Sequence, residues 1–80
     1  MLITIKYFGM LVEITNTTQE SYQYDLEDIS INDIELSILS RYPNLKNTTY
    51  NIAVNQQIAT KNQPIKNGDE LAFLPPFAGG

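Results

Sequence analysis

Hydrophobic and polar residues alternate at the start of the chain. Ile3, Ile5 and Tyr7 fall on one side of an extended segment, and the residues between them fall on the other. A period of two with β-branched residues predicts a strand over residues 2–8. The side opposite this apolar set carries Leu2, Thr4, Lys6 and Phe8.

The period changes twice over the next segment. Residues 10–14 predict one or two helical turns after Gly9, and the polar run 15–19 predicts a loop. Alternation returns over residues 21–26, with two tyrosines on one side, and predicts a second strand. Because the connection is short, we expect this strand to run antiparallel to the first.

A helix signal begins at Ser30. Ser30 and Asp33 resemble a capping box, in which each side chain accepts a hydrogen bond from the other residue's backbone N–H. Apolar residues then recur at helical spacing, which predicts a helix with one buried face that ends before Pro43. These apolar residues are Ile31, Ile34, Ile38 and Leu39.

Short strands and turns are expected in the rest of the chain. Residues 44–50 predict a loop, with Leu45 as its anchor in the core. The pair Asn67-Gly68 is a strong turn signal that leads into the last strand. The strands are expected over residues 52–55, 58–60 and 69–74.

This order of elements, ββαβββ, predicts an α+β fold with a mixed sheet of about five strands and one main helix. With the first and last strands as central neighbours, the arrangement is that of a ubiquitin-like β-grasp. At 80 residues and 9.1 kDa the chain has room for one domain, 1–80. We expect residues 75–80 to form an extended C-terminal tail outside it.

The composition excludes several classes of function. There are no Cys or His residues, which removes disulfides, thiolate or His-based catalysis and nearly every zinc or haem site, so no metal is expected. Five Lys and Arg residues against nine Asp and Glu residues give a net charge of −4, which disfavours nucleic acid as a partner. No apolar run is long enough to cross a membrane, and no signal peptide is visible. We therefore expect a cytoplasmic protein.

The side chains offer little for catalysis. Asp69 and Glu70 are adjacent in a strand and point to opposite faces, so they cannot work as an acid–base pair. Glu27 and Asp28 lie at a junction between strand and helix, where a solvated or capping role is the simpler interpretation. From its side chains alone, the chain is not predicted to be an enzyme.

The end of the sequence carries a different signal. A Gly-Gly pair at this place arises by chance in roughly 0.5% of chains. Pro75 and Pro76 favour a stiff, extended path, and six such residues reach on the order of 18 Å. Gly79 and Gly80 lack side chains and could thread a narrow channel. The functional group of such a tail is the α-carboxylate of Gly80, which ATP can convert to an acyl-adenylate and a sulfur nucleophile then to a thiocarboxylate.

The sequence resembles the small, sulfur-carrying subunit of molybdopterin synthase, the MoaD family, over its whole length. The resemblance rests on several motifs together, because any one of them would be weak. They are Tyr7-Phe8-Gly9, Glu13-Ile14, Ala53-Val54-Asn55-Gln56, the run from Asn67-Gly68-Asp69-Glu70 through Leu71-Ala72-Phe73-Leu74 to Pro75-Pro76, and Gly79-Gly80. Val12 departs from the pattern, because members often carry an Arg before the Glu, which puts contacts with the activating enzyme in doubt.

The resemblance implies a sulfur carrier in molybdenum cofactor biosynthesis. An activating enzyme related to ubiquitin E1 (MoeB-like) would use ATP to adenylate Gly80, and a sulfur donor would form the thiocarboxylate. The tail, Pro75, Pro76, Phe77, Ala78 and Gly79, would insert into the large subunit (MoaE-like) and donate sulfur to cyclic pyranopterin monophosphate. A heterotetramer is implied, with no permanently bound cofactor and no catalysis by this subunit alone.

A docking face is expected from the strand pattern as well. Phe8, Ile58 and Leu74 lie on strand faces opposite the predicted core, and an apolar cluster exposed on a small acidic domain suggests a protein interface. These positions match those that contact the large subunit in the family. The alternative is that a crossover loop covers them.

Three other functions stay open. A ThiS-like sulfur carrier for thiamine thiazole synthesis would share the tail chemistry, although such proteins are usually shorter, lack the segment resembling 9–19 and typically lack Pro-Pro. A ubiquitin-like modifier would join Gly80 to lysines. A plain interaction module would have an inert tail.

Overall fold

The computed structural model describes residues 1–25, 27–60 and 62–76. Its strands and helices follow the predicted order, with one additional 3₁₀ helix, η1, after the main helix. The bounds are β1 Leu2–Tyr7, α1 Leu11–Thr15, β2 Gln19–Gln23, α2 Ile31–Arg41, η1 Pro43–Asn47, β3 Asn51–Val54, β4 Gln57–Ile58 and β5 Glu70–Leu74.

The strands form one mixed sheet in the order β2-β1-β5-β3-β4. The first and last strands, β1 and β5, are parallel neighbours at its centre, and the other pairs are antiparallel. A five-stranded sheet of this order with one main helix is the ubiquitin-like β-grasp, so the predicted fold class and the central pairing are confirmed.

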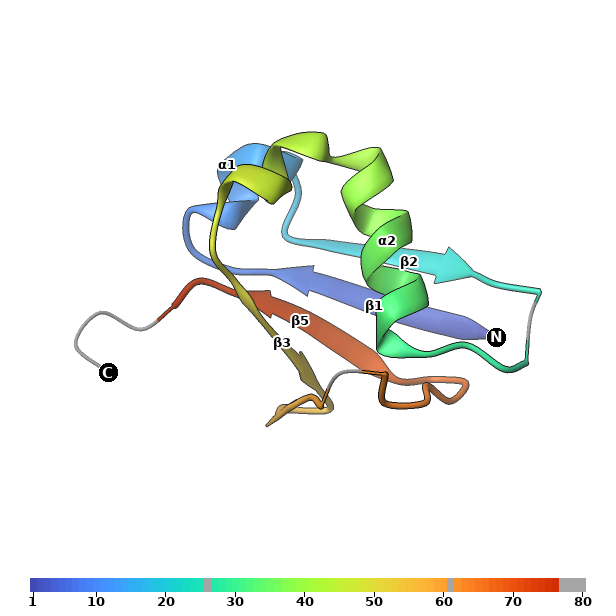
Figure 1. Cartoon of the computed structure of the whole chain (residues 1–80). Helices are drawn as coiled ribbons and strands as arrows, with labels where there is room; N and C mark the ends of the chain where they lie inside the picture. The colour runs from blue at the N-terminus through green and yellow to red at the C-terminus, as the bar shows by residue number, and fades with distance from the viewer. Residues whose placement is uncertain (26, 61, 77–80) are drawn as a thin grey trace.

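Both α-helices lie over the same face of the sheet, as Figure 1 shows. The alternation in β1 follows from this arrangement, because Ile3, Ile5 and Tyr7 are buried toward the helices while Thr4 and Lys6 are only half-buried. We call the other side of the sheet the open face. The core between sheet and helices contains Ile3, Ile5, Tyr7, Leu11, Ile29, Ile31, Ile34, Ile38, Leu45, Val54, Ile65, Leu71 and Phe73.

The capping box predicted at the start of α2 is confirmed. The Ser30 hydroxyl accepts a hydrogen bond from the Asp33 backbone N–H at 3.4 Å, and the Asp33 carboxylate accepts one from the Ser30 N–H at 3.0 Å. The helix ends at Arg41, and Pro43 starts η1. The loop predicted over 44–50 is therefore wrong in its first half, although Leu45 is buried as expected.

The position of the second strand differs from its prediction over 21–26. β2 spans Gln19–Gln23 because it pairs antiparallel with β1, from Lys6 opposite Gln19 to Leu2 opposite Gln23. One further hydrogen bond joins the Tyr24 N–H to the carbonyl of Met1, the residue before β1 begins. The loop predicted over 15–19 is correspondingly shorter, and Leu26 lies outside the described residues.

The remaining boundaries move by one or two residues. α1 is one residue later than predicted, β3 is one residue earlier, and β4 is limited to Gln57–Ile58. Asn55 and Gln56, both with positive φ, make the two-residue turn between β3 and β4. Gly68 occupies the predicted turn before β5 with a φ of 87°. In the described part of the chain, no helix has the length and apolar character that crossing a membrane requires.

Candidate functional site

A shallow hollow of about 370 Å³ lies on the open face of the sheet. Four strands contribute to it, and apolar side chains supply most of its surface. We call it the open-face hollow, and its lining residues are Lys6, Phe8, Ala53, Gln56, Ile58, Glu70, Ala72 and Leu74.

Small residues at the centre of the sheet make the floor of the hollow. The strand registers place Ala53 opposite Ala72, with Ile58 on the far side of Ala53 and Lys6 on the far side of Ala72. A row of two methyl side chains between longer ones leaves a depression. Such a depression suits an apolar side chain from another protein, because apolar pockets at the centre of an interface provide most of its affinity.

The structure brings together the three residues predicted to bind a partner. Phe8 follows β1 and is 44% exposed, Ile58 in β4 is 63% exposed, and Leu74 at the end of β5 is half-buried. All three line the open-face hollow, and no described segment covers Phe8 or Ile58. Exposed large apolar groups around one hollow are typical of an interaction site.

One ion pair borders the hollow. The Lys6 ammonium lies 3.3 Å from the Glu70 carboxylate, and each side chain is about a third exposed, at 35% and 37%. Sequence reasoning did not single out this pair or the alanine floor. Alternation places Lys6 beside Phe8 and Ala72 beside Leu74, but the pairing of β1 with β5 and of β5 with β3 was needed to bring these residues to one spot.

The start of the predicted tail leaves the sheet beside the hollow. The Phe8 N–H donates a 3.2 Å hydrogen bond to the Phe73 carbonyl, which ties the end of β1 to the end of β5. Pro75 is half-buried and Pro76 is exposed, and both lie beyond the last strand. The predicted tail residues Phe77, Ala78 and Gly79 and the predicted reactive residue Gly80 lie outside the described residues.

A group of ionisable side chains lies on the helix side of the sheet. The Glu20 carboxylate accepts hydrogen bonds from the hydroxyls of Tyr7 and Tyr22, each at 2.9 Å, and of Tyr42 at 2.7 Å. Arg41 lies 3.6 Å from the same carboxylate. We call these five residues the Glu20 cluster, and it joins β1 and β2 to the end of α2.

The titration of the Glu20 cluster reflects these contacts. Burial raises the pKa of Glu20, but the three tyrosine hydrogen bonds and the Arg41 charge outweigh it and hold the pKa below its usual value. Burial, followed by hydrogen bonding to the carboxylate, raises the pKa values of Tyr7 and Tyr22. The carboxylate is thus fully engaged in the fold, and the cluster does not form part of the open-face hollow.

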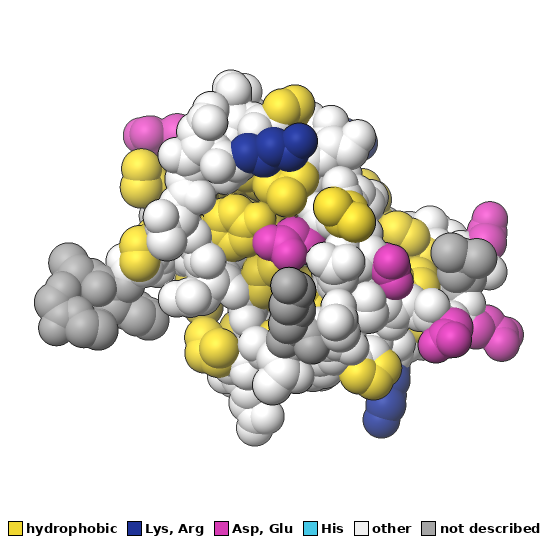
Figure 2. All heavy atoms as spheres, in the orientation of Figure 1, with side chains coloured by type: hydrophobic (Ala, Val, Ile, Leu, Met, Phe, Trp, Pro, Cys, Tyr) yellow, Lys and Arg dark blue, Asp and Glu magenta, His cyan; other side chains and the backbone are white. Residues whose placement is uncertain are grey.

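The described residues contain no obvious metal site. Across 1–25, 27–60 and 62–76, no three acidic side chains gather closely enough to hold a metal ion. The loop between β2 and α2 carries exposed acidic side chains, which lie at the right-hand end of Figure 2. The open-face hollow and the adjacent start of the tail are therefore the best candidate site.

Comparison with known proteins identifies the family of this chain. A model of the ThiS family matches residues 5–80, including Gly79 and Gly80. The molybdopterin synthase sulfur carrier subunit of Mycobacterium tuberculosis is 29% identical over an alignment of 80 positions, which covers 98% of this chain and 96% of that protein.

Two solved structures have the same fold. A chain in the complex of subunits 1 and 2 of molybdopterin-converting factor from Helicobacter pylori superposes with a TM-score of 0.70 and 25% identity, with complete coverage of both chains. SAMP1, the small archaeal modifier protein 1 of Haloferax volcanii, superposes with a TM-score of 0.82 and 24% identity over 99% of each chain.

Proposed function

Since this chain belongs to the ThiS family, we propose that it is the sulfur-carrying small subunit of a molybdopterin synthase. The observation that carries the proposal is the family match, which extends through Gly79 and Gly80. The almost full-length alignment with a molybdopterin synthase sulfur carrier subunit supports the same assignment. The resemblance recognised in the sequence is thereby confirmed at the level of the family.

The proposed reactive group is the α-carboxylate of Gly80. A carboxylate resists attack by nucleophiles, so an activating enzyme would first join one of its oxygens to the α-phosphorus of ATP and release pyrophosphate. A sulfur donor at the oxidation level of sulfide would then attack the carbonyl carbon and displace AMP. The product is a thiocarboxylate, and no catalytic side chain or bound cofactor is required of this chain.

The open-face hollow is the proposed docking site for the large subunit. Its alanine floor and its rim of Phe8, Ile58 and Leu74 present an apolar surface that a partner would bury. The tail begins directly beside it, since Leu74 lines the hollow and Pro75 follows. Docking there would fix the origin of the tail, and Phe77, Ala78 and Gly79 would lead Gly80 to the partner's active site in a heterotetramer.

The ThiS family match also supports a second candidate function, in which the chain supplies sulfur to a different pathway. A sulfur carrier for thiazole synthesis would use the same thiocarboxylate and would differ only in the acceptor of the sulfur. The presence of α1 and of the Pro75-Pro76 pair favours the molybdopterin pathway, because thiazole sulfur carriers typically lack both. A protein modifier shares the fold, as the likeness to SAMP1 illustrates.

The pathway is tested directly by identifying the molecule that accepts the sulfur. The chain would be incubated with an activating enzyme, ATP and sulfide, then supplied with a large subunit and cyclic pyranopterin monophosphate. We expect molybdopterin to form, and a chain lacking Gly80 to give none. Molybdopterin formation by the chain without Gly80 would refute the mechanism. Sulfur transfer only to a thiazole synthase, or isopeptide bonds to lysines, would assign one of the alternatives.

A further inference from the structure

The residue between β1 and α1 adopts a backbone conformation that most side chains disfavour. Gly9 has a φ of +58°, in the left-handed region. Left-handed φ alone does not require glycine in this chain, because Asn16 at 61° and Asn55 at 50° adopt it with side chains. Asparagine tolerates this region better than most residues, so a further reason is needed for glycine at position 9.

The further reason is a contact with the start of the tail. A Cβ atom placed on Gly9 would lie 2.9 Å from Pro75 Cγ and 3.6 Å from Pro75 Cδ. A separation of 2.9 Å is well inside the usual 3.5–4.0 Å optimum for two carbon atoms, so any side chain here would displace the proline ring. The main chain at Gly9 therefore forms the surface on which Pro75 packs.

Backbone hydrogen bonds hold both sides of this contact. On one side, the Phe8 N–H donates to the Phe73 carbonyl at 3.2 Å. Phe8 directly precedes Gly9, and Phe73 lies two residues before Pro75. On the other side, the Val12 N–H donates to the Gly9 carbonyl at 3.2 Å, at the start of α1. Gly9 is thus fixed between a strand and a helix. Pro75 has a preset φ of its own and packs on a surface that cannot easily yield.

We propose that Gly9 is a positioning residue for the C-terminal segment: its missing side chain lets Pro75 pack on the main chain, which sets the direction in which the segment leaves β5. The inference rests on the proposed function, because a direction matters only where Gly80 must reach a reaction centre. A reactive atom displaced by about 1 Å can cost on the order of 100-fold in rate.

Asparagine substitutions separate the contact from the backbone conformation. Gly9→Asn keeps a residue that tolerates left-handed φ but introduces the Cβ that meets Pro75. Gly68→Asn is the matched control, because Gly68 has a φ of +87° and nothing within 4 Å of its Cβ position. Pro75→Ala removes Cγ and Cδ, so the double variant with Gly9→Asn relieves the clash.

The rate of Gly80 thiocarboxylation is the functional measurement. For Gly9→Asn we expect a kcat about 10- to 100-fold below wild type. KM for the carrier should stay within about twofold, because a positioning residue changes where Gly80 is held and leaves the rest of the folded surface unchanged. Gly68→Asn should match wild type, and the double variant should recover to the rate of Pro75→Ala alone. Equal rates for Gly9→Asn and Gly68→Asn, or no recovery in the double variant, would overturn the inference.

An NMR measurement keeps this inference distinct from the proposed function. We expect nuclear Overhauser effects between the Gly9 Hα protons and the Pro75 ring protons in the wild-type chain, and their absence would overturn the inference whatever the activity. A wild-type chain that shows these effects but gains no sulfur would overturn the proposed function and leave the packing of Pro75 on Gly9 established. Urea unfolding of each variant would verify that the fold is retained.

Discussion

Two consecutive residues at the end of β1 serve opposite sides of the sheet. Tyr7 is buried toward the helices, where its hydroxyl donates to Glu20, whereas Phe8 lines the open-face hollow. A strand turns successive side chains to opposite faces, so Tyr7 contacts the Glu20 cluster on one face while Phe8 lines the open-face hollow on the other. Gly9 follows at once and packs on Pro75. Of these three adjacent residues, Tyr7 belongs to the core, Phe8 to the proposed docking surface and Gly9 to the proposed positioning of the tail.

Phe8→Glu should weaken docking without unfolding the protein. The side chain is 44% exposed, so a charge there can be hydrated in the free protein but would be desolvated against a partner. We expect Kd for the large subunit to rise about 30-fold, or about 2 kcal/mol, by calorimetric titration. Leu36→Glu, on the exposed surface of α2, is the control and should bind as wild type. Equal affinities for the two variants would place the docking surface elsewhere.

Glu20→Gln should destabilise the fold in a way that depends on pH. At pH 7 the wild-type carboxylate accepts three hydroxyl bonds, and we expect the variant to lose about 1–3 kcal/mol of unfolding free energy. Because the folded-state pKa of Glu20 lies below its usual value of 4.5, this stabilisation is complete above that pH and is lost as the pH falls through the folded pKa.

The measurement is urea unfolding of wild type and Glu20→Gln at a series of pH values. The difference between their unfolding free energies should narrow as the pH drops below about 4.5. Glu13→Gln, an exposed change on α1, should stay within about 0.5 kcal/mol of wild type. A difference that widens on acidification would contradict the assigned role of the Glu20 carboxylate.

At the scale of the elements, short-range sequence signals predicted the start of α2, but they missed the position of β2, which depends on strand pairing. The capping residues Ser30 and Asp33 define the start of α2 from sequence, because their hydrogen bonds span only three residues. The position of β2 depends on how much of β1 is available to pair with, which its own alternation around Tyr22 and Tyr24 does not encode. η1 was missed because residues after Pro43 carry no strong helical periodicity.

The cap of α2 offers a test at this scale. Ser30→Ala removes the hydroxyl that accepts from the Asp33 N–H, and we expect a loss of about 1 kcal/mol in unfolding free energy. Ser40→Ala, at an exposed position within the same helix, should be neutral or slightly stabilising because Ala has the higher helix propensity. Chemical denaturation would compare the two, and similar losses would show that the capping bond contributes nothing specific.

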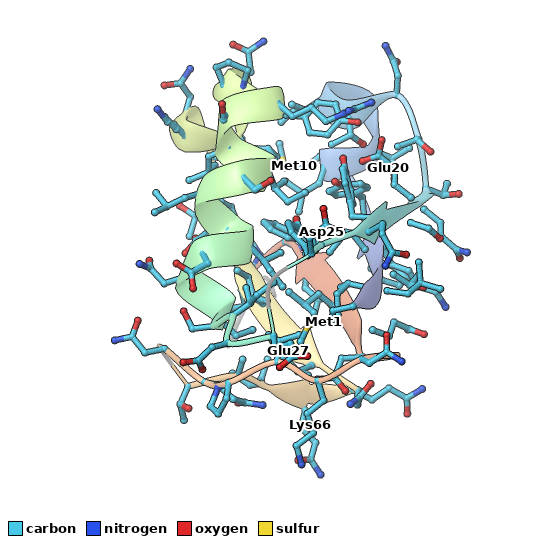
Figure 3. The ribbon with its side chains drawn as sticks, turned by 90° about the vertical axis from the view of Figure 1, so that its right-hand side faces the viewer. Met1, Met10, Glu20, Asp25, Glu27 and Lys66 are labelled. Carbon is cyan, nitrogen blue, oxygen red and sulfur yellow. The ribbon has the colours of Figure 1, made fainter. Side chains whose placement is uncertain are left out.

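At the scale of the whole molecule, the chain leaves the sheet at the end opposite the loop between β2 and α2, which carries exposed acidic residues. In Figure 3, Met10, from the connection between β1 and α1, lies toward the end of the molecule where α2 finishes. Glu27, from the loop between β2 and α2, and Lys66 lie at the end where α2 begins. The chain leaves β5 at the end that carries α1 (Figure 1). The open-face hollow was predictable in part, because alternation exposed Phe8 and Leu74. Its alanine floor and its Lys6–Glu70 border were not, since they arise only from the register of four strands.

Deletion of Gly79 and Gly80 should separate folding from function. Within the described residues, which stop at Pro76, the last core side chain is Phe73 and the last strand residue is Leu74. We therefore expect the unfolding free energy to stay within about 0.5 kcal/mol of wild type. Sulfur transfer should be abolished, because the α-carboxylate of Gly80 is removed and the new terminal carboxylate, on Ala78, is two residues too short to take its place. Thermal unfolding and the thiocarboxylation assay would be run on the same preparation, and retained transfer would contradict the proposal.

The most direct test of the central claim is the mass of the protein itself. The full chain would be incubated with ATP, an activating enzyme and a sulfur source, and its intact mass and the mass of its C-terminal peptide would be measured. The proposed function predicts a gain equal to one oxygen replaced by one sulfur, confined to the peptide that ends in Gly80 and absent without ATP. An unchanged mass, or a gain located elsewhere in the chain, would contradict it.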